Sequence, residues 1–302
     1  MLKGDGEQTG LTALGAQGLP LLNDGDGPMS REASLAQAQN IIRSIMASRH
    51  DRPSLVAQIT CEIGAEIVEA IIPPGHDLNT VELARRYQTS RTPVREALLL
   101  LENEGLVDIP PRKRPRAHSH MIAEVREIYR TRTVLFELMA TDVATRVTDQ
   151  DIDLLRCITK RMERACNLND VIAFAWLSVE FHDQDTRLSG NSTAKRIHDS
   201  LLLRTLSIRR LSLSQPGRLE RSLDNHIQLV KAYETHDPHM ASAILRANHT
   251  GALAAVEKYY EQTGLLKLAG SSKIVKATSG PAAAPKGRRH SAKLLAGPCQ
   301  SL

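Results

Sequence analysis

Apolar residues recur every three to four positions along most of the second half of this chain. That spacing puts them on one face of a helix, and it is interrupted by short polar segments. Asp237 followed by Pro238 is typical of a helix start, because Asp caps the first turn and proline has no N–H to lose there. The pattern predicts six helices, at about residues 122–147, 149–166, 168–188, 192–213, 217–235 and 238–263. We expect them to pack as an all-α bundle.

The first half of the chain predicts shorter elements. Apolar stripes indicate one amphipathic helix at 34–48, to which the pattern assigns no role, and another at 55–70. Asn79 is a suitable N-cap for a third, short helix, and Glu82 stands three residues later, as in a capping box.

A fourth helix follows after a turn of about three residues. Ser90 and Thr92 are both suitable N-caps, and Pro93 is tolerated in a first turn. Gly105 is typical of the residue that ends a helix. One face is apolar, and the opposite face exposes two arginines and two hydroxyls at the opening turn. Two short helices joined by such a turn predict a helix-turn-helix motif.

The segment after this helix indicates a small β-hairpin. Residues 106–109 read as a strand, 110–116 as a turn rich in proline and arginine, and 117–119 as a returning strand. The fold class predicted for the whole chain is therefore mainly α. It consists of an N-terminal winged helix-turn-helix followed by an all-α helical bundle.

The net charge and the composition are consistent with binding to double-stranded nucleic acid. The net charge is +5, and aromatic residues make up 3% of the chain, which argues against stacking on single-stranded RNA. Arg91 and Arg95 are expected to contact bases, since the fork of an arginine matches O6 and N7 of guanine. Phosphate contacts are expected from Ser90, Thr92, Arg112, Lys113, Arg114 and Arg116.

Three histidines in the predicted bundle form the second group of interest. His182, His226 and His249 fall in three different helices, each among apolar residues. Inward-facing histidines are used to build metal sites in bundles. A histidine on an apolar face is also commonly a hydrogen-bonded core residue, so both interpretations stay open.

The remaining features limit location and domain organisation. Four cysteines form no Cys-x-x-Cys pair, and neither a signal peptide nor an apolar run of membrane length is present, so we expect a cytoplasmic protein with no membrane contact. The expected domains are a disordered extension (1–33), a winged helix-turn-helix with an extra N-terminal helix (34–119), a helical domain (120–268) and a basic disordered tail (269–302).

The run from Ser90 to Leu98, with Leu101, Glu102 and Gly105 after it, resembles the DNA-binding domain of GntR-family bacterial transcriptional regulators. The resemblance covers about sixty-five residues. One departure is the wing, which in that family commonly turns on a glycine; here Arg114 and Pro115 stand at the expected tip.

The helical half resembles the effector domain of the FadR-type branch of that family, the FCD domain, on the residues around His182, His226 and His249 and on Arg132. The resemblance implies a divalent metal held by these histidines, with zinc, nickel and manganese as candidates. It also implies a small carboxylate effector, held with the help of Arg132 and, at its edge, Ser178 and Asn191. Ser178 stands where the family has an aspartate ligand, which weakens the case for a metal.

These observations predict a regulator that binds a double-stranded DNA operator as a homodimer, with the effector shifting operator affinity. Two alternatives stay open. One is a metalloenzyme, in which three histidines activate a water molecule, and the other is a DNA-binding dimer whose effector site has decayed. Since no nucleophile motif, Walker loop or dinucleotide fingerprint occurs, we expect no enzymatic activity.

Overall fold

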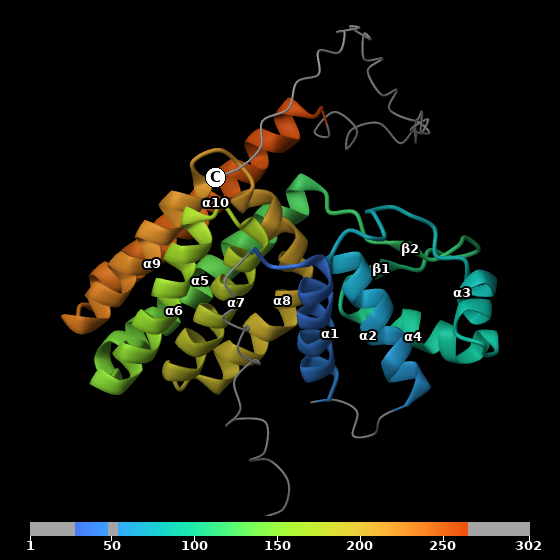
Figure 1. Cartoon of the computed structure of the whole chain (residues 1–302), viewed down its shortest axis with the longest axis horizontal. Helices are drawn as coiled ribbons and strands as arrows, with labels where there is room; N and C mark the ends of the chain where they lie inside the picture. Colours follow the sequence, from blue (N-terminus) through green and yellow to red (C-terminus); the bar gives the residue numbers. More distant parts are fainter. Residues whose placement is uncertain (1–27, 48–53, 265–302) are drawn as a thin grey trace, which may run out of the picture.

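The computed structural model describes residues 28–47 and 54–264 (Figure 1). Within these ranges the chain forms ten helices and one two-stranded sheet. The helices are α1 (Arg31–Ala47), α2 (Leu55–Val68), α3 (Thr80–Arg86), α4 (Arg91–Asn103), α5 (Ile122–Arg146), α6 (Asp149–Asn167), α7 (Val171–Leu188), α8 (Ser192–Leu213), α9 (Arg218–Glu234) and α10 (Pro238–Gln262), and the strands are β1 (Val107–Asp108) and β2 (Arg116–Ala117). The predicted fold class is confirmed.

Local capping explains why the predicted helix bounds agree closely with the observed ones. Asp237 accepts a hydrogen bond from the Met240 amide, and Thr148 forms a capping box with Asp151. At α3, however, the Asn79 side chain accepts from the Val81 amide and donates to the Glu82 carboxylate, so the predicted capping box is replaced by a side-chain pair.

Two predicted helix starts differ from the structure by three residues, and the other predicted helix ends by at most two. The extra helix α1 begins at Arg31 rather than 34, and α7 begins at Val171 rather than 168, since Asp170 is its cap. The predicted disordered ends fall mostly on residues 1–27 and 265–302, which lie outside the described residues.

The winged helix-turn-helix has its core between α2 and α4. Gly64 lies at their closest approach, where a Cβ atom would come within 2.9 Å of Ile42 and of Leu101. Glycine therefore lets α1 and α4 pack on α2 without displacing the ends of the Ile42 and Leu101 side chains. The opposite face of α4 is left in solvent.

The wing contains a segment that the sequence pattern did not indicate. β1 pairs antiparallel with β2, and residues 75–78 add an edge to β2, with Leu78 donating to the Pro115 carbonyl at 2.7 Å. The turn is formed by residues 110–113, with Arg112 in the left-handed region at φ 60°. The prediction of Arg114 and Pro115 at the tip was wrong, because the Lys113 amide donates to the Pro110 carbonyl and the positive φ falls on Arg112, which places the tip earlier in the chain.

Helix α1 lies between the two halves of the molecule (Figure 1). Ile41 and Ile42 belong to the same apolar cluster as Leu98 of α4 and Leu203 of α8. The helix thus fills the junction between the DNA-binding half and the bundle, a role the pattern alone did not assign.

Polar contacts at this junction connect four helices. Trp176 of α7 donates to the Ser34 hydroxyl of α1 at 2.8 Å, and Ser34 donates to Glu69, which follows α2, at 2.9 Å. Arg210 of α8 binds the Glu69 carboxylate with both terminal nitrogens. Because these side chains are at most partly exposed, removing one partner of the ion pair leaves a poorly solvated charge and destabilises the junction.

Helices α5, α6, α7, α9 and α10 form a second apolar core, which includes Phe136, Phe174, Phe181 and Tyr233. Among the described residues, no helix has the length and apolar character needed to cross a membrane.

Candidate functional site

The opening turn of α4 presents the predicted base-contacting residues to solvent. Arg91, Thr92 and Arg95 are exposed, while Val94 and Leu98, on the other side of the helix, are fully buried. Ser90 is the N-cap, yet its hydroxyl makes no capping hydrogen bond, so it is available to another partner. The hydrophobic face thereby fixes which side of α4 can enter a groove of DNA.

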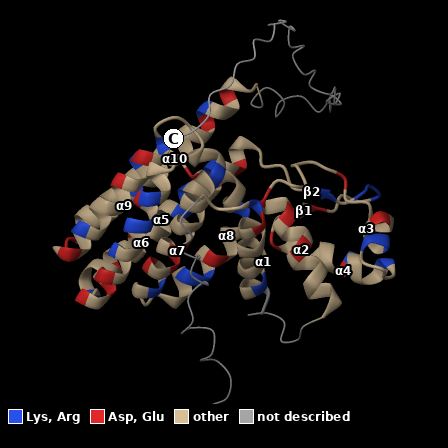
Figure 2. Ribbon diagram, viewed as in Figure 1, with Lys and Arg blue, Asp and Glu red and all other residues tan. Residues whose placement is uncertain are grey.

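Helix α4 and the wing together enclose a groove of about 600 Å³. In Figure 2 the ribbon is coloured blue, for Lys and Arg, over the wing turn and over part of α3. The groove brings together residues predicted for DNA contact from both elements, namely Arg91, Thr92, Arg95, Arg112, Lys113 and Arg114. No carboxylate lines it among the described residues.

Arg116 differs from the other basic residues of the wing. Its Nε lies 3.3 Å from an Asp108 carboxylate oxygen across the β1–β2 pair. The side chain is 41% exposed, so it stays a predicted phosphate contact while also holding the two strands together.

The helical half contains a small buried cavity of about 30 Å³, enough for one or two water molecules. Side chains from α5, α7, α8, α9 and α10 line it. They include three arginines, two histidines and several neutral polar groups, and no carboxylate: Tyr129, Arg132, Ser178, His182, Arg209, Ser212, Leu213, Arg218, Ser222, Asn248, His249 and Ala252.

The three arginines of this cavity have few partners. Arg132 is 2% exposed, and its Nε and Nη2 atoms make no hydrogen bond within the described structure. Arg209 donates to the Ser178 hydroxyl at 2.6 Å, and Arg218 donates to Asn248 at 2.8 Å. Burial lowers the pKa of all three, that of Arg209 to about 9, with the charge of Arg132 adding to the effect. The cavity is strongly electropositive, and no carboxylate of the described residues lines it.

The three predicted metal ligands lie beside this cavity. The ring centroid of His182 is 5.2 Å from that of His226 and 6.0 Å from that of His249. His226 and His249 donate from Nδ1 to backbone carbonyls one turn earlier, at 2.6 and 2.9 Å, which leaves both Nε2 atoms unprotonated. Burial lowers the pKa of each imidazole, so all three are neutral at pH 7.

Their surroundings fit a divalent cation poorly. The Phe136 ring lies 4.7 Å from His182 and 4.8 Å from His249, centroid to centroid. Ser178, in place of an acidic ligand, is bound to the Arg209 guanidinium. The ligand atoms of the three histidines are not among those that approach within 4.8 Å of one another in the described residues. Metal at these histidines stays a prediction.

Two further residues do not line the cavity. Asn191 caps α8 by accepting from the Ala194 amide at 3.0 Å. Asp185 is buried against the Tyr233 hydroxyl, to which it is hydrogen-bonded.

Arg209 and Arg218 were not predicted as site residues from the sequence. A signal for Arg209 was present, because it falls on the apolar stripe of α8 that includes Leu202, Leu206 and Leu213. A charge on a stripe that is otherwise buried indicates a site or a buried pair.

Comparison with known proteins agrees with this architecture. Residues 55–115 match the model of bacterial regulatory proteins of the gntR family, and residues 127–250 match the model of the FCD domain. The chain is 27% identical over 217 residues to the gluconate operon transcriptional repressor of Bacillus licheniformis. The aligned region covers 68% of this chain and 86% of that protein. It is 34% identical over 116 residues to an uncharacterized HTH-type transcriptional regulator of Agrobacterium vitis, covering 37% of this chain and 68% of that protein.

Solved structures show the same fold. The structure of Escherichia coli McbR/YncC matches with a TM-score of 0.58 and 23% sequence identity. The structure of a GntR regulator from Rhodococcus sp. RHA1 matches with a TM-score of 0.59 and 16% sequence identity. Each comparison covers 69% of this chain and 100% of the other. The chain is a DNA-binding transcriptional regulator and not an enzyme, and it belongs to the GntR family of bacterial regulatory proteins, with an FCD domain as its C-terminal half.

Proposed function

We propose that this regulator binds its operator as a homodimer and that a small anion with at least two negative charges, such as a dicarboxylate, controls its affinity for DNA. One observation carries the proposal. Arg132, Arg209 and Arg218 converge on a buried cavity that no carboxylate lines among the described residues. Burying an unpaired guanidinium costs several kcal/mol, so a multiply charged anion is the ligand such a cavity favours.

The small volume of the cavity suggests how binding acts on the protein. At about 30 Å³ the cavity admits only water. A dicarboxylate must therefore separate Arg209 from Ser178, a contact that joins α8 to α7. The anion then binds the two guanidinium nitrogens that Arg132 leaves without partners.

The same two helices reach the DNA-binding half. On α8, Arg209 lines the cavity while the next residue, Arg210, binds Glu69 beside α2. On α7, Ser178 lines the cavity while Trp176 binds Ser34 of α1. A shift of α7 against α8 thus changes how α1 and α2 are held. We expect a coupling between anion and DNA of about 1–3 kcal/mol, a common range for allosteric proteins.

For the operator, we propose that Arg91 and Arg95 contact bases in the major groove. Ser90, Thr92 and the basic residues of the wing, namely Arg112, Lys113, Arg114 and Arg116, contact phosphates. Two copies of α4 related by a dimer axis then read successive major grooves. Light scattering that reports a mass near 33 kDa, the mass of one chain, without DNA and one chain per duplex in the complex contradicts the dimer.

The experiment that tests the proposal measures operator affinity by fluorescence anisotropy, on a duplex selected from a random-sequence library. Succinate, malonate and citrate are added in turn, together with gluconate, because one relative is named for a gluconate operon. We expect a di- or tricarboxylate to change the dissociation constant about 5- to 150-fold. Arg209→Gln should remove this change. Arg196→Gln, on the exposed side of the same helix, should retain it. An equal response in wild type and Arg209→Gln contradicts the proposal.

A further inference from the structure

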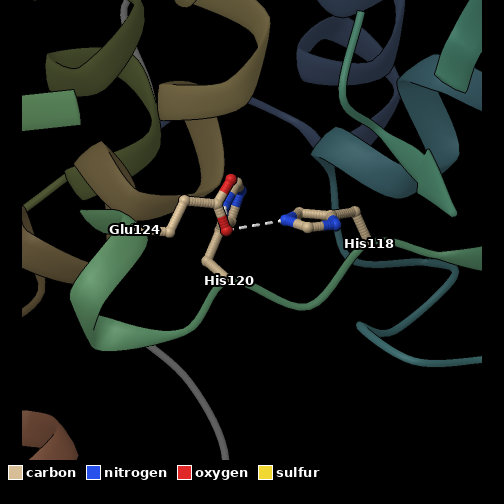
Figure 3. Close-up of side chains that lie close together, drawn as sticks. All are labelled: His118, His120 and Glu124. Atoms are coloured by element: carbon tan, nitrogen blue, oxygen red, sulfur yellow. Dashed lines mark hydrogen bonds and ion pairs between the residues drawn. The ribbon is translucent and has the colours of Figure 1, made fainter. Parts of the chain in front are cut away.

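A group of metal-ligating side chains lies outside both sites, in the linker between the wing and α5. Figure 3 shows His118, His120 and Glu124, which we call the linker triad, with their side chains turned toward one another. His118 directly follows β2, and Glu124 is in the first turn of α5. Their ligand atoms all lie within 4.8 Å of one another.

The spacing of these atoms suits one small cation. Glu124 Oε2 is 2.9 Å from His118 Nε2 and 3.4 Å from His120 Nδ1. Ligands about 2.0–2.1 Å from a tetrahedral zinc ion stand about 3.3 Å apart from one another. Small shifts of the side chains therefore bring all three into one coordination shell.

The surrounding residues already orient the two imidazoles. His118 Nδ1 is 2.7 Å from an Asp108 carboxylate oxygen, so Nδ1 keeps its proton when a cation takes the place of the proton on Nε2. This carboxylate–histidine arrangement is what most histidine ligands of zinc have behind them. Asp108 is held in turn by Arg116, and the His120 carbonyl accepts from the Tyr260 hydroxyl of α10 at 2.9 Å.

Ion pairing without a metal accounts for only part of this arrangement. His118 lies between two carboxylates and is satisfied as an ion pair. His120, by contrast, is 11% exposed at its side chain, and its buried Nδ1 atom makes no hydrogen bond of good geometry within the described structure. A cation shared by the three side chains satisfies that atom.

We propose that the linker triad binds one zinc ion, with a water molecule in the fourth position. Two imidazoles and one carboxylate are a ligand set that zinc accepts and that magnesium and calcium do not favour. The ion joins the wing strand β2 to helix α5, and it therefore sets the orientation of the DNA-binding half relative to the bundle. This site is independent of the anion cavity and of the bundle histidines.

The test uses the full-length protein, stripped with a chelator and titrated with Zn²⁺ alone against a competing colorimetric chelator. Glu124→Gln and His120→Ala should each lose one equivalent of zinc or bind it at least about 10-fold more weakly. Asp108→Asn, which acts through His118, should weaken binding about 10- to 100-fold. His239→Ala, an exposed histidine of α10, should bind as the wild type does.

Two results overturn the proposal. One is a wild-type protein that binds no zinc. The other is zinc that persists in Glu124→Gln and His120→Ala but is lost in the double variant His182→Ala, His226→Ala, since that locates the ion in the bundle. Circular dichroism of each metal-free variant identifies a folding defect. If His120→Ala is misfolded, Glu124→Gln decides, because it removes a charge and retains the size and hydrogen-bonding capacity of the side chain.

Discussion

Replacing Arg209 by methionine should make the ligand-free protein more stable while removing its response to anions. Burial and the charge of Arg132 lower the pKa of Arg209 from the ordinary arginine value to about 9. A lowered arginine pKa means that the charged form is disfavoured in the folded state, so the protein loses stability as pH falls from the ordinary arginine pKa, and the full loss applies below about 9. At pH 7 the shift corresponds to a destabilisation on the order of 5 kcal/mol.

The substitution also removes a favourable contact. Ser178 loses its 2.6 Å hydrogen bond from Arg209, which costs about 1–3 kcal/mol if the hydroxyl stays unpaired. Ser178 lies within α7, so its hydroxyl can instead bond a carbonyl of its own helix, which places the cost at the low end. The net gain in the free energy of unfolding is then about 2 kcal/mol or more, and methionine fills a similar volume without a charge.

Thermal unfolding followed by circular dichroism checks this expectation, at pH 7 in a buffer without phosphate or carboxylate. A gain of about 2 kcal/mol raises the melting temperature by roughly 4–8 °C for a protein of this size. Citrate or succinate should raise the melting temperature of the wild type and leave that of Arg209→Met unchanged. Arg196→Met, on the exposed face of α8, should stay within about 0.5 kcal/mol of the wild type. An Arg209→Met protein that is less stable than the wild type without ligand refutes the reasoning, because the guanidinium is then satisfied within the protein.

Three other predictions concern DNA binding, the junction and a buried acid. Arg95→Ala should cost about 1–3 kcal/mol on the selected operator and relax its sequence preference, whereas Arg114→Ala should weaken all sequences alike and reduce the salt slope by about 1, as measured by anisotropy. Glu69→Gln weakens the ion pair with Arg210, so citrate should still raise the melting temperature but should change operator affinity less than in the wild type. The pKa of Asp185 is raised by burial from 3.8 to about 7, so the wild type loses stability as pH rises between these values. Asp185→Asn should therefore melt higher than the wild type at pH 8 and no higher near pH 4; a constant difference across this range contradicts the assignment.

Local sequence determined the helices and much of the surface that we propose binds DNA. The caps Thr148 and Asp237 bond to amides within three residues, so their effect on helix starts does not depend on the rest of the fold. The exposure of Arg91 and Arg95 followed from the apolar stripe on the other face of α4. In the same way, three histidines could be assigned to the interior of the bundle before the structure was known.

The packing of the helices decided which buried side chains contact one another inside the bundle. Arg209 and Arg210 are neighbours on α8, and consecutive helix residues point about 100° apart, so one reaches the cavity and the other reaches Glu69. The positions of α7, which carries Ser178, and of α2, which is followed by Glu69, decide which arginine makes which contact. Phe136 belongs to α5 and comes to rest against histidines of α7 and α10, which no spacing along the chain encodes.

The linker triad shows the same limit. Residues 118 and 119 were predicted as strand, but β2 ends at Ala117, so the sequence pattern does not say where the side chains that follow point. Only the pairing of β2 with β1 and the start of α5 bring His118, His120 and Glu124 together. Sequence by itself determined which elements form and which faces they bury, because capping and periodicity act within a few residues. The tertiary structure alone decided which charges meet, because that depends on contacts between residues far apart in the chain.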